Sequence, residues 1–244
     1  MEQFTDFAYI YDELNVHYDK DGIISRMKQL LGGSREVVDL CCGTGDVAIA
    51  MAKNGHNVVG IDVSEDMLNV ATEKAMESAA RVFFLCEDAR SFVLNKKVDA
   101  VYSLTDGMNY MLTDEDLEKA FCAVNKALKT GGRFIFDVST EYKYKSLLKD
   151  KTFTFDFDDE FVVWQNEYDE DSCICTMTVT GFVREKKHYT RFDEIHKQKC
   201  HSRKTVEHLL DKCGFELVDA FAGYSDKVLG DEDERALFVA VKKN

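Results

Sequence analysis

Residues 36–62, EVVDLCCGTGDVAIAMAKNGHNVVGID, combine an apolar run, a glycine turn, an alanine-rich stretch, a second apolar run and a final aspartate. The run from Val37 to Leu40 is typical of a strand buried on both faces, and it ends before Gly43 and Gly45. Those glycines permit a tight turn and let a ligand approach the backbone closely. The stretch therefore predicts a β-α-β unit that holds a nucleoside cofactor.

The second half of this unit supplies a helix and an acid. The stretch from Val47 to Ala52 favours a helix, and Asn54-Gly55 is typical of its end. A second strand then delivers Asp62, which lies 17 residues after Gly45. An acid at that distance is expected to bind ribose hydroxyls.

Two cofactor classes fit the glycine turn. Gly43-Thr-Gly45-Asp-Val-Ala48 satisfies the loose G-x-G-x-x-G/A pattern, so an NAD(P)-dependent oxidoreductase or a flavin enzyme is one alternative. Asp39 favours the other class. A fixed negative charge just before the turn would repel a pyrophosphate and attract an ammonium group. The ligand is thus expected to have a cationic head and a ribose, as S-adenosylmethionine has.

At this point the residues resemble a known family. Asp39-Leu-Cys-Cys-Gly43-Thr-Gly45 is similar to the first motif of class I S-adenosylmethionine-dependent methyltransferases, with Cys41 in place of the first glycine of the family's triplet. Later segments resemble the ends of its second, third and fourth strands and the glycine turn into its fifth. Those segments are residues 62–68, 83–89, 98–104 and 128–137, so the resemblance covers roughly residues 36–138.

The resemblance implies a role for each matching residue. Asp62 would bind both ribose hydroxyls, the apolar residues after it would contact adenine, and Asp88 would meet the adenine amino group. The implied cofactor-binding residues of the core are Asp39, Cys41, Gly43, Gly45, Asp62, Val63, Met67, Asp88, Ala89 and Leu104.

The same resemblance implies an α/β fold: a Rossmann-like, mainly parallel seven-stranded sheet in the order 3-2-1-4-5-7-6, with its last strand antiparallel and helices on both faces. Residues 1–140 and 203–244 would form the cofactor-binding core. Residues 141–202 separate the fifth strand from the next expected helix, and their alternating apolar and polar positions predict three to four antiparallel strands. We expect this insertion to cap the carboxyl ends of the core strands as a β lid.

The N-terminal residues add a second possible lid. Apolar residues from Phe4 to Leu14 recur at roughly helical spacing, and a second helical stretch runs from Gly22 to Leu31. This segment could simply pack on the sheet. However, FAYIYDEL resembles the N-terminal lid of small-molecule methyltransferases, which implies that Tyr11 or Tyr18 reaches the cofactor or a substrate amine.

The end of the insertion refines the resemblance. Residues 189–196, YTRFDEIH, are similar to the β lid of amino-sugar N,N-dimethyltransferases and, more loosely, of glycine N-methyltransferase. Strand alternation would place Arg191 on one face, with Tyr189 and Asp193, and His196 on the other, with Phe192 and Glu194. One of these faces would meet the cavity. Arg191 and His196 are therefore candidate substrate contacts, and a structural role for each stays open.

Methyl transfer from a sulfonium is an in-line displacement, so the protein mainly aligns the nucleophile, excludes water and removes a proton where one must leave. The loop after the fourth strand lies where the acceptor would enter. The candidates for a base or orienting group are Asp106, His196 and Tyr11, and the candidates for substrate contact are Asn109, Tyr110 and Arg191.

Charge and composition indicate the kind of acceptor. The formal net charge is −14 and no basic stripe is visible, which disfavours a nucleic acid. The chain has no proline, so the Asn/Asp-Pro-Pro-aromatic loop of many base-modifying methyltransferases is absent. We expect a small-molecule acceptor. A tRNA or rRNA methyltransferase and a non-catalytic cofactor-binding protein stay as alternatives, and the sequence leaves the oligomeric state open.

The remaining features suggest a cytoplasmic protein. No apolar run approaches the roughly 18 residues of a membrane span, and the first residues lack the basic start of a signal peptide. The eight cysteines show no repeated pair spacing, so we expect reduced thiols that fill the core. Cys173, Cys175, Cys200 and His201 are the residues that could supply zinc ligands, but no metal site is expected because Cys-x-Cys in an apolar strand does not form a ligand loop.

Overall fold

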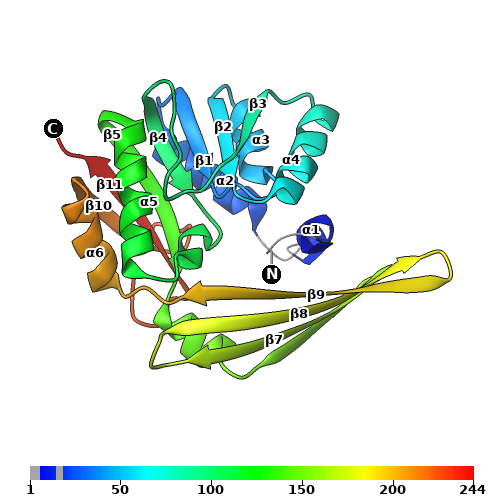
Figure 1. Cartoon of the computed structure of the whole chain (residues 1–244). Helices are drawn as coiled ribbons and strands as arrows, with labels where there is room; N and C mark the ends of the chain where they lie inside the picture. Colours follow the sequence, from blue (N-terminus) through cyan, green and yellow to red (C-terminus); the bar gives the residue numbers. More distant parts are fainter. Residues whose placement is uncertain (1–5, 15–18) are drawn as a thin grey trace.

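The computed structural model describes residues 6–14 and 19–244. A seven-stranded sheet with helices on both faces forms the core, and a separate four-stranded sheet lies beside it (Figure 1). The core strands are β1 (Glu36–Leu40), β2 (Asn57–Asp62), β3 (Val82–Cys86), β4 (Val98–Ser103), β5 (Leu128–Ser139), β10 (Phe215–Ala222) and β11 (Arg235–Lys242).

The core sheet has the order β3-β2-β1-β4-β5-β11-β10. Val38 of β1 pairs in parallel with Val59 of β2 on one side and with Val101 of β4 on the other. The final strand of the chain, β11, runs antiparallel to both β5 and β10. This arrangement confirms the predicted Rossmann-like order, and it brings the carboxyl ends of β1 to β4 to one edge of the sheet.

Helices cover the two faces of this sheet because successive strand residues point in opposite directions. On one face, α2 and α3 pack Met27 and Met51 against Val37 and Tyr102. On the other face, α5 and α6 pack against strand residues that include Val38. The helices are α2 (Lys20–Leu31), α3 (Asp46–Lys53), α4 (Glu65–Glu77), α5 (Asp114–Ala127) and α6 (Arg203–Lys212). No helix in the described part of the chain is long and apolar enough to cross a membrane.

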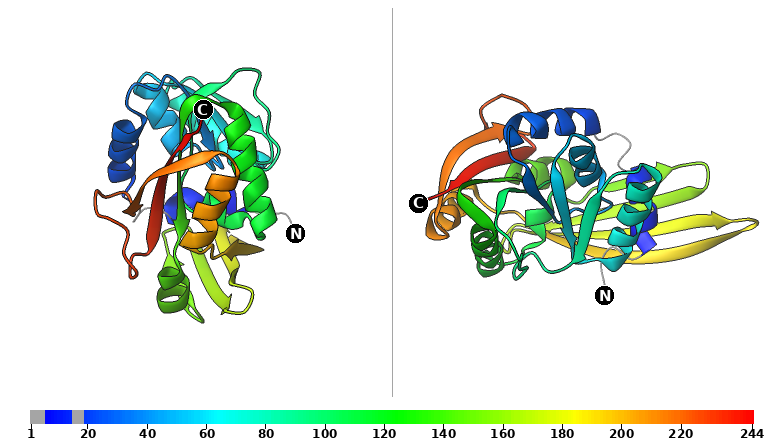
Figure 2. Two further views of the ribbon diagram at one scale, coloured as in Figure 1. Left: turned by 90° about the vertical axis from the view of Figure 1, so that its left-hand side faces the viewer. Right: turned by 90° about the horizontal axis from the view of Figure 1, so that it is seen from above.

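The insertion after β5 forms four antiparallel strands, as predicted. They are β6 (Thr152–Asp156), β7 (Glu160–Asp169), β8 (Ile174–Glu185) and β9 (His188–Lys199), in that spatial order, and we call them the insertion sheet. A π-helical turn, η3 (Lys143–Leu148), precedes them. The insertion sheet extends beyond the core at one end (Figure 2).

The described N-terminal residues lie between the core and the insertion sheet (Figure 1). They form a 3-10 turn, η1 (Asp6–Tyr9), and one helical turn, α1 (Tyr11–Leu14). Ile10 and Leu14 are buried with Val162, Val179 and Phe192 of the insertion sheet. The N-terminal segment therefore fills the apolar face of the insertion sheet instead of packing on the main sheet.

The cysteines depart from the expectation of reduced thiols. Cys122 of α5 and Cys213, at the end of α6, form a disulfide across 91 residues, so the prediction is wrong for this pair. The other six cysteines are free. Cys175 and Cys200 are buried beside Tyr168 in an apolar cluster under the insertion sheet. Among residues 6–14 and 19–244, no group of three or more His, Cys, Asp or Glu side chains is placed to hold a metal ion.

Candidate active site

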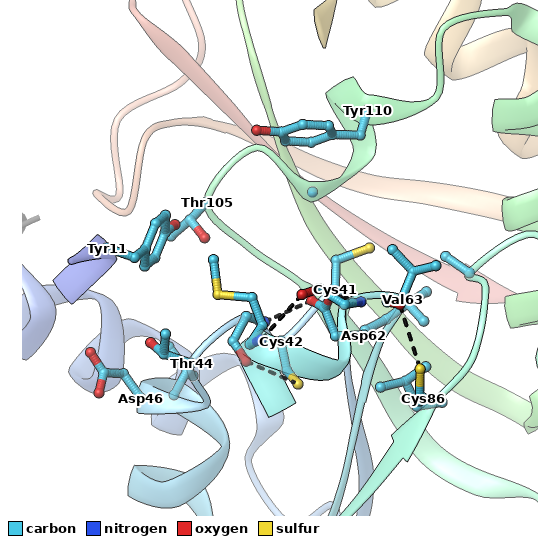
Figure 3. A pocket seen from close by; sticks show the side chains of 18 of the residues that line it. Tyr11, Cys41, Cys42, Thr44, Asp46, Asp62, Val63, Cys86, Thr105 and Tyr110 are labelled. Carbon is cyan, nitrogen blue, oxygen red and sulfur yellow. Dashed lines mark hydrogen bonds between the residues drawn. The ribbon is translucent and has the colours of Figure 1, made fainter. Parts of the chain in front are cut away.

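The carboxyl ends of β1 to β4 open into a cavity of about 880 Å³ (Figure 3). A cavity of this size can hold a nucleoside cofactor together with a small second ligand. It is lined by the turn after β1, by the first residues after β2, β3 and β4, and by α1 and α2. The predicted site residues among its lining are Tyr11, Cys41, Gly43, Asp62, Val63, Met67, Asp88, Ala89 and Tyr110.

The two glycines of the turn after β1 serve different purposes. Both have positive φ angles, 52° for Gly43 and 76° for Gly45. A Cβ on Gly43 would meet nothing within 4 Å, so this residue leaves open space for a ligand. A Cβ on Gly45 would come within 2.9 Å of the Ala71 side chain. Gly45 therefore permits close packing of α4 on the turn, and it does not line the cavity.

Asp62 is held rigidly at the end of β2. Its Oδ2 accepts a hydrogen bond from the Gly43 amide (2.8 Å), and its Oδ1 accepts one from the Ser64 amide (3.0 Å). Burial raises the pKa of this carboxyl group, and the two amides oppose the shift. Since a carboxylate oxygen has two lone pairs, each oxygen can still accept a hydrogen bond from a ligand hydroxyl.

The wall beside Asp62 is suited to a flat aromatic ring. Val63 is 68% exposed and Met67 and Ala89 are buried, so together they offer an apolar surface at the ends of β2 and β3. Asp88 lies at the edge of this surface. Its Oδ1 accepts a hydrogen bond from Arg90 Nε (2.9 Å), and this interaction lowers the pKa of Asp88.

The far end of the cavity is bounded by two tyrosines and a threonine. Tyr11 comes from α1, Thr105 follows β4, and Tyr110 ends the 3-10 turn η2 (Gly107–Tyr110). Figure 3 shows Tyr11 beside Thr105, with Tyr110 on the other side of the same opening. Burial raises the pKa of Tyr11 to about 12, so its hydroxyl stays protonated near neutral pH.

Two further predicted cofactor residues, Asp39 and Leu104, are buried and do not line the cavity. Asp39 points from β1 toward the start of α3. Burial raises its pKa well above the usual range, while Tyr102 and the Ala48 amide act in the opposite direction. Asp39 is therefore not placed to contact a ligand ammonium group directly.

The predicted base Asp106 is engaged elsewhere. Its carboxylate forms ion pairs with Arg235 (Nη1–Oδ1 2.8 Å) and Lys143 (Nζ–Oδ2 3.2 Å), and Ser139 Oγ donates to it at 2.6 Å. Its side chain does not line the cavity. The structure therefore places Asp106 in a buried salt-bridge network instead of beside a reacting atom.

The side chain of the predicted substrate residue Asn109 is bonded to two backbone groups instead of facing the cavity. Its Nδ2 donates to the Lys199 carbonyl oxygen (2.8 Å), and its Oδ1 accepts from the Ser139 amide (2.9 Å). The side chain is fully buried and does not line the cavity. Asn109 thus joins η2 to β5 and to the end of β9.

The two candidates on β9 lie on opposite faces, as alternation predicted. His196 is buried behind Tyr110, with 3.5 Å between Tyr110 Oη and His196 Nδ1. The Arg191 side chain is 60% exposed and pairs with Asp193 on the outer face, so it is not brought to the cavity. Tyr18 lies outside the described residues.

A polar network at the rim of the cavity has almost no signal in the sequence. Asp12 of α1 accepts a hydrogen bond from Thr44 Oγ1 (2.7 Å) and pairs with Lys74 Nζ of α4 (2.5 Å). Lys74 also pairs with Asp46, which in turn pairs with Lys20 (2.5 Å). The network ties α1 to the core next to Tyr11. Its only sequence signal is that Asp12 follows Tyr11 directly, and nothing in the sequence links it to Lys74.

Comparisons with known proteins agree with this geometry. Residues 37–132 match the family model described as a methyltransferase domain. Over 240 residues the chain is 33% identical to YqeM of Bacillus subtilis (strain 168), a protein provisionally named a methyltransferase, and the match covers 98% of this chain and 97% of YqeM.

Solved structures give the same result. An S-adenosylmethionine-dependent methyltransferase from Clostridium acetobutylicum ATCC 824 is 29% identical, with a TM-score of 0.87 and complete coverage of both chains. The sugar N-methyltransferase KedS8 from Streptoalloteichus sp ATCC 53650 has the same fold, with a TM-score of 0.78 at 19% identity over 97% of this chain and 93% of KedS8.

The chain belongs to the S-adenosylmethionine-dependent methyltransferases. It is an enzyme of the class I fold, and its cofactor is S-adenosylmethionine. This assignment decides against the nicotinamide-dependent alternative that the glycine turn had left open.

Proposed function

We propose that this enzyme transfers the methyl group of S-adenosylmethionine to a nitrogen or oxygen atom of a small-molecule acceptor. The observation that carries the proposal is a single cavity that runs from Asp62 to Tyr11 and Tyr110. One end offers groups suited to a nucleoside. The other end is bounded by Tyr11 and Asp12 of α1 and by Tyr110 of η2, which suits a compact acceptor better than a continuous polymer.

The cofactor roles follow from the position of each group. Asp62 would accept hydrogen bonds from the ribose hydroxyls, since its oxygens are already oriented by two amides. Val63, Met67 and Ala89 would contact adenine, and Asp88 would accept from the adenine amino group. Gly43 would give the amino-acid part of the cofactor room beside the backbone.

The charge of the cavity fits a cationic cofactor. Its lining contains seven acids, Asp12, Asp46, Asp62, Glu65, Asp66, Glu87 and Asp88, against two basic residues, Lys20 and Arg90. Negative potential in a partly enclosed site attracts the sulfonium and ammonium groups of S-adenosylmethionine. Asp39 would contribute from beneath the turn, through the field and the shape of the turn, without direct contact.

The same charges argue for an acceptor without phosphate groups. Among the described residues that line the cavity, Lys20 already pairs with Asp46, and Arg90 pairs with Asp88. A phosphate entering there would meet more acids than cations, which disfavours a tRNA or rRNA acceptor. The fold shared with a sugar N-methyltransferase supports a small polar acceptor such as an amine.

We further propose that residues 141–202 and the N-terminal segment act together as a lid over residues 19–140 and 203–244. The insertion sheet contacts Ile10 and Leu14, and α1 supplies both Tyr11 and the Asp12 pair with Lys74. A lid of this kind would exclude water from the displacement reaction.

Two measurements test the proposal. Isothermal titration calorimetry with S-adenosylhomocysteine should show binding, and no binding should be seen with NAD(P). The purified full chain should then release S-adenosylhomocysteine when incubated with S-adenosylmethionine and a panel of amines, hydroxy compounds and bulk tRNA. Turnover with an amine or hydroxy compound supports the proposal, whereas turnover confined to tRNA would contradict it.

A further inference from the structure

Two titratable side chains are buried on the inner face of β9, where apolar residues would pack equally well. Glu194 is 3% exposed and His196 is 1% exposed, and their neighbours on the same face of β8 are Met177 and Val179. Burying such groups costs free energy unless they interact with each other and with a partner. Their placement therefore calls for an explanation beyond the packing of the sheet.

The contacts of this pair lead to the cavity. Glu194 Oε2 lies 3.2 Å from His196 Nε2, and His196 Nδ1 lies 3.5 Å from Tyr110 Oη. The rings of Tyr110 and His196 meet edge to face, with centroids 6.3 Å apart and planes at 82°. Because Tyr110 lines the cavity, the three side chains form a path from the cavity to a buried carboxylate.

We propose that Tyr110, His196 and Glu194 form a proton relay that takes the proton of the acceptor atom during methyl transfer. This inference rests on the proposed function, since it assigns the groups that serve the acceptor. Tyr110 is the member that would touch the acceptor, and His196 and Glu194 are positioning residues that act through it.

The relay balances in atoms and charge. The lone pair of the acceptor atom forms the new bond to the methyl carbon while the carbon–sulfur bond breaks. The electron pair of the broken bond stays on sulfur and neutralises the sulfonium. The acceptor's proton passes to Tyr110 Oη as the Tyr110 proton moves to His196 Nδ1. The resulting imidazolium is stabilised by the Glu194 carboxylate, and the proton returns through Tyr110 to water after the product leaves.

The surroundings favour this path over the other two predicted bases. Asp106 is occupied by Arg235 and Lys143 and does not line the cavity. Tyr11 does line the cavity, but burial raises its pKa to about 12. Burial raises the pKa of Tyr110 well above the usual range, so an isolated phenolate is disfavoured and a second group must receive its proton. Gln198, next but one to His196 on the same face, accepts from Tyr144 Oη (2.9 Å) and also forms a side-chain hydrogen bond with Tyr110, which partly opposes the rise in the Tyr110 pKa. An amide cannot take up a proton near neutral pH, so His196 is the neighbour of Tyr110 that can.

The relay narrows the acceptor class. A proton acceptor is useful only if the attacking nitrogen or oxygen carries a proton that must leave. Primary or secondary amines and hydroxyl groups meet this condition, whereas tertiary amines and thioethers do not. The acceptor is therefore expected to be an amine or hydroxy compound that still carries hydrogen on the attacking atom.

The test uses two cofactor analogues, so that it does not depend on knowing the acceptor. Sinefungin carries an amine in place of the methylsulfonium group, and S-adenosylhomocysteine lacks that amine. Calorimetry on the full chain compares their dissociation constants in wild type, Tyr110→Phe and Glu194→Gln. Asp193→Asn is the matched control, because it removes a carboxylate from the adjacent residue on the exposed face of β9.

We expect Tyr110→Phe and Glu194→Gln to raise the dissociation constant of sinefungin by about tenfold or more, as for the loss of one hydrogen bond to a charged group, and to change that of S-adenosylhomocysteine by less than about twofold. Asp193→Asn should affect neither ligand. If the dissociation constants of both ligands rose equally, Tyr110 and Glu194 would have only a structural role and the relay would be wrong. An unchanged dissociation constant for sinefungin would also overturn the relay. If wild type bound neither analogue, the proposed function itself would fail.

A second readout examines the relay without any ligand. In ¹⁵N spectra of the histidine side chains, the resonances of His196 are identified by their loss in His196→Gln. Tyr110→Phe should shift its Nδ1 resonance and Glu194→Gln its Nε2 resonance, while Asp193→Asn leaves both in place. Resonances that respond to neither variant would show that the three groups are not connected in solution.

Discussion

Arg235 of β11 holds Asp106 in a buried ion pair, with Nη1 2.8 Å from Oδ1, although the two residues lie 129 positions apart. The same guanidinium contacts Asp137 Oδ1 at 2.6 Å, and Asp137 accepts from the Thr105 and Asp106 amides, both at 2.8 Å. These contacts stabilise the turn at Thr105 and Asp106, whose φ angles are both positive, 58° and 72°. Asp106 therefore shapes the turn that carries Tyr110.

Arg235→Gln is expected to destabilise the fold strongly, because it leaves Asp106 and Asp137 buried without their shared cation. Removing one partner of a buried pair typically lowers the free energy of unfolding by about 3–5 kcal/mol. Urea unfolding measures the loss. Arg203→Gln removes an exposed pair with Glu207 and should cost less than about 1 kcal/mol. Equal losses for the two variants would contradict the assigned role of Arg235.

Asp106→Asn should make the free energy of unfolding less dependent on pH in the acid range. Burial alone would raise the pKa of Asp106, but Arg235 and Lys143 hold it well below the usual range. A carboxyl group with a depressed pKa in the folded state stabilises above its unfolded pKa of about 3.9, and this contribution is lost as the pH falls. The difference in unfolding free energy between wild type and variant should therefore be largest near neutral pH and shrink in acid. A difference that stays constant across the pH series would refute the assignment.

Asp62→Asn should weaken cofactor binding. The variant replaces one acceptor oxygen with an NH₂ group, which would face either the Gly43 or the Ser64 amide and could not accept from a ribose hydroxyl. We expect the dissociation constant of S-adenosylhomocysteine to rise by about tenfold or more, as for a lost hydrogen bond to a charged group. Glu73→Gln, an exposed change on α4, serves as the control. Unaltered affinity in Asp62→Asn would remove Asp62 from the site.

Gly107→Ala should be destabilising, and Cys41→Gly should relieve part of that effect. A Cβ on Gly107 would lie 2.8 Å from Cys41 Cβ and 2.8 Å from Ser103 Oγ. Cys41 itself has φ 58°, a conformation that costs an L-residue about 1–2 kcal/mol. A double-mutant cycle should give a coupling of about 0.5–3 kcal/mol. Strictly additive effects would argue against the contact. Gly33→Ala, where a Cβ meets nothing within 4 Å, is the control.

The disulfide can be checked by counting thiols. Alkylation of the denatured, unreduced protein should modify six cysteines, and alkylation after reduction should modify eight. Mass spectrometry distinguishes the two. Because Cys122 and Cys213 close a loop of 91 residues, reduction should lower the free energy of unfolding by about 2–5 kcal/mol. Eight modified cysteines without reduction would show that the pair is not bonded.

Strand ends were the most predictable part of the site. Asp62 and Asp88 line the cavity because parallel strands bring their carboxyl ends to one edge of the sheet. Asp39 also lies near a strand end, but alternation along β1 puts it on the same face as Val37, where it is buried beneath the start of α3 and does not line the cavity. Alternation gives the face of Asp39, but its depth beneath the glycine turn depends on how α3 packs and is not visible in the sequence.

Contacts between distant segments could not be predicted. Alternation separated Arg191 from His196 correctly, but only the packing of Ile10 and Leu14 decides which face of the insertion sheet is covered. Likewise, Asp12 and Lys74 are 62 residues apart and belong to segments with no shared pattern. Such pairs depend on how the N-terminal segment docks, which local sequence does not encode.

The two hydrogen bonds of Asn109 have a mechanical consequence. One bond goes to Ser139, where the chain leaves the core for the insertion, and the other goes to Lys199, where the insertion ends. Any rotation of the insertion sheet must therefore either break one of these bonds or carry η2 along. Since η2 bears Tyr110, a movement that opens the cavity would also withdraw this side chain from the cavity wall.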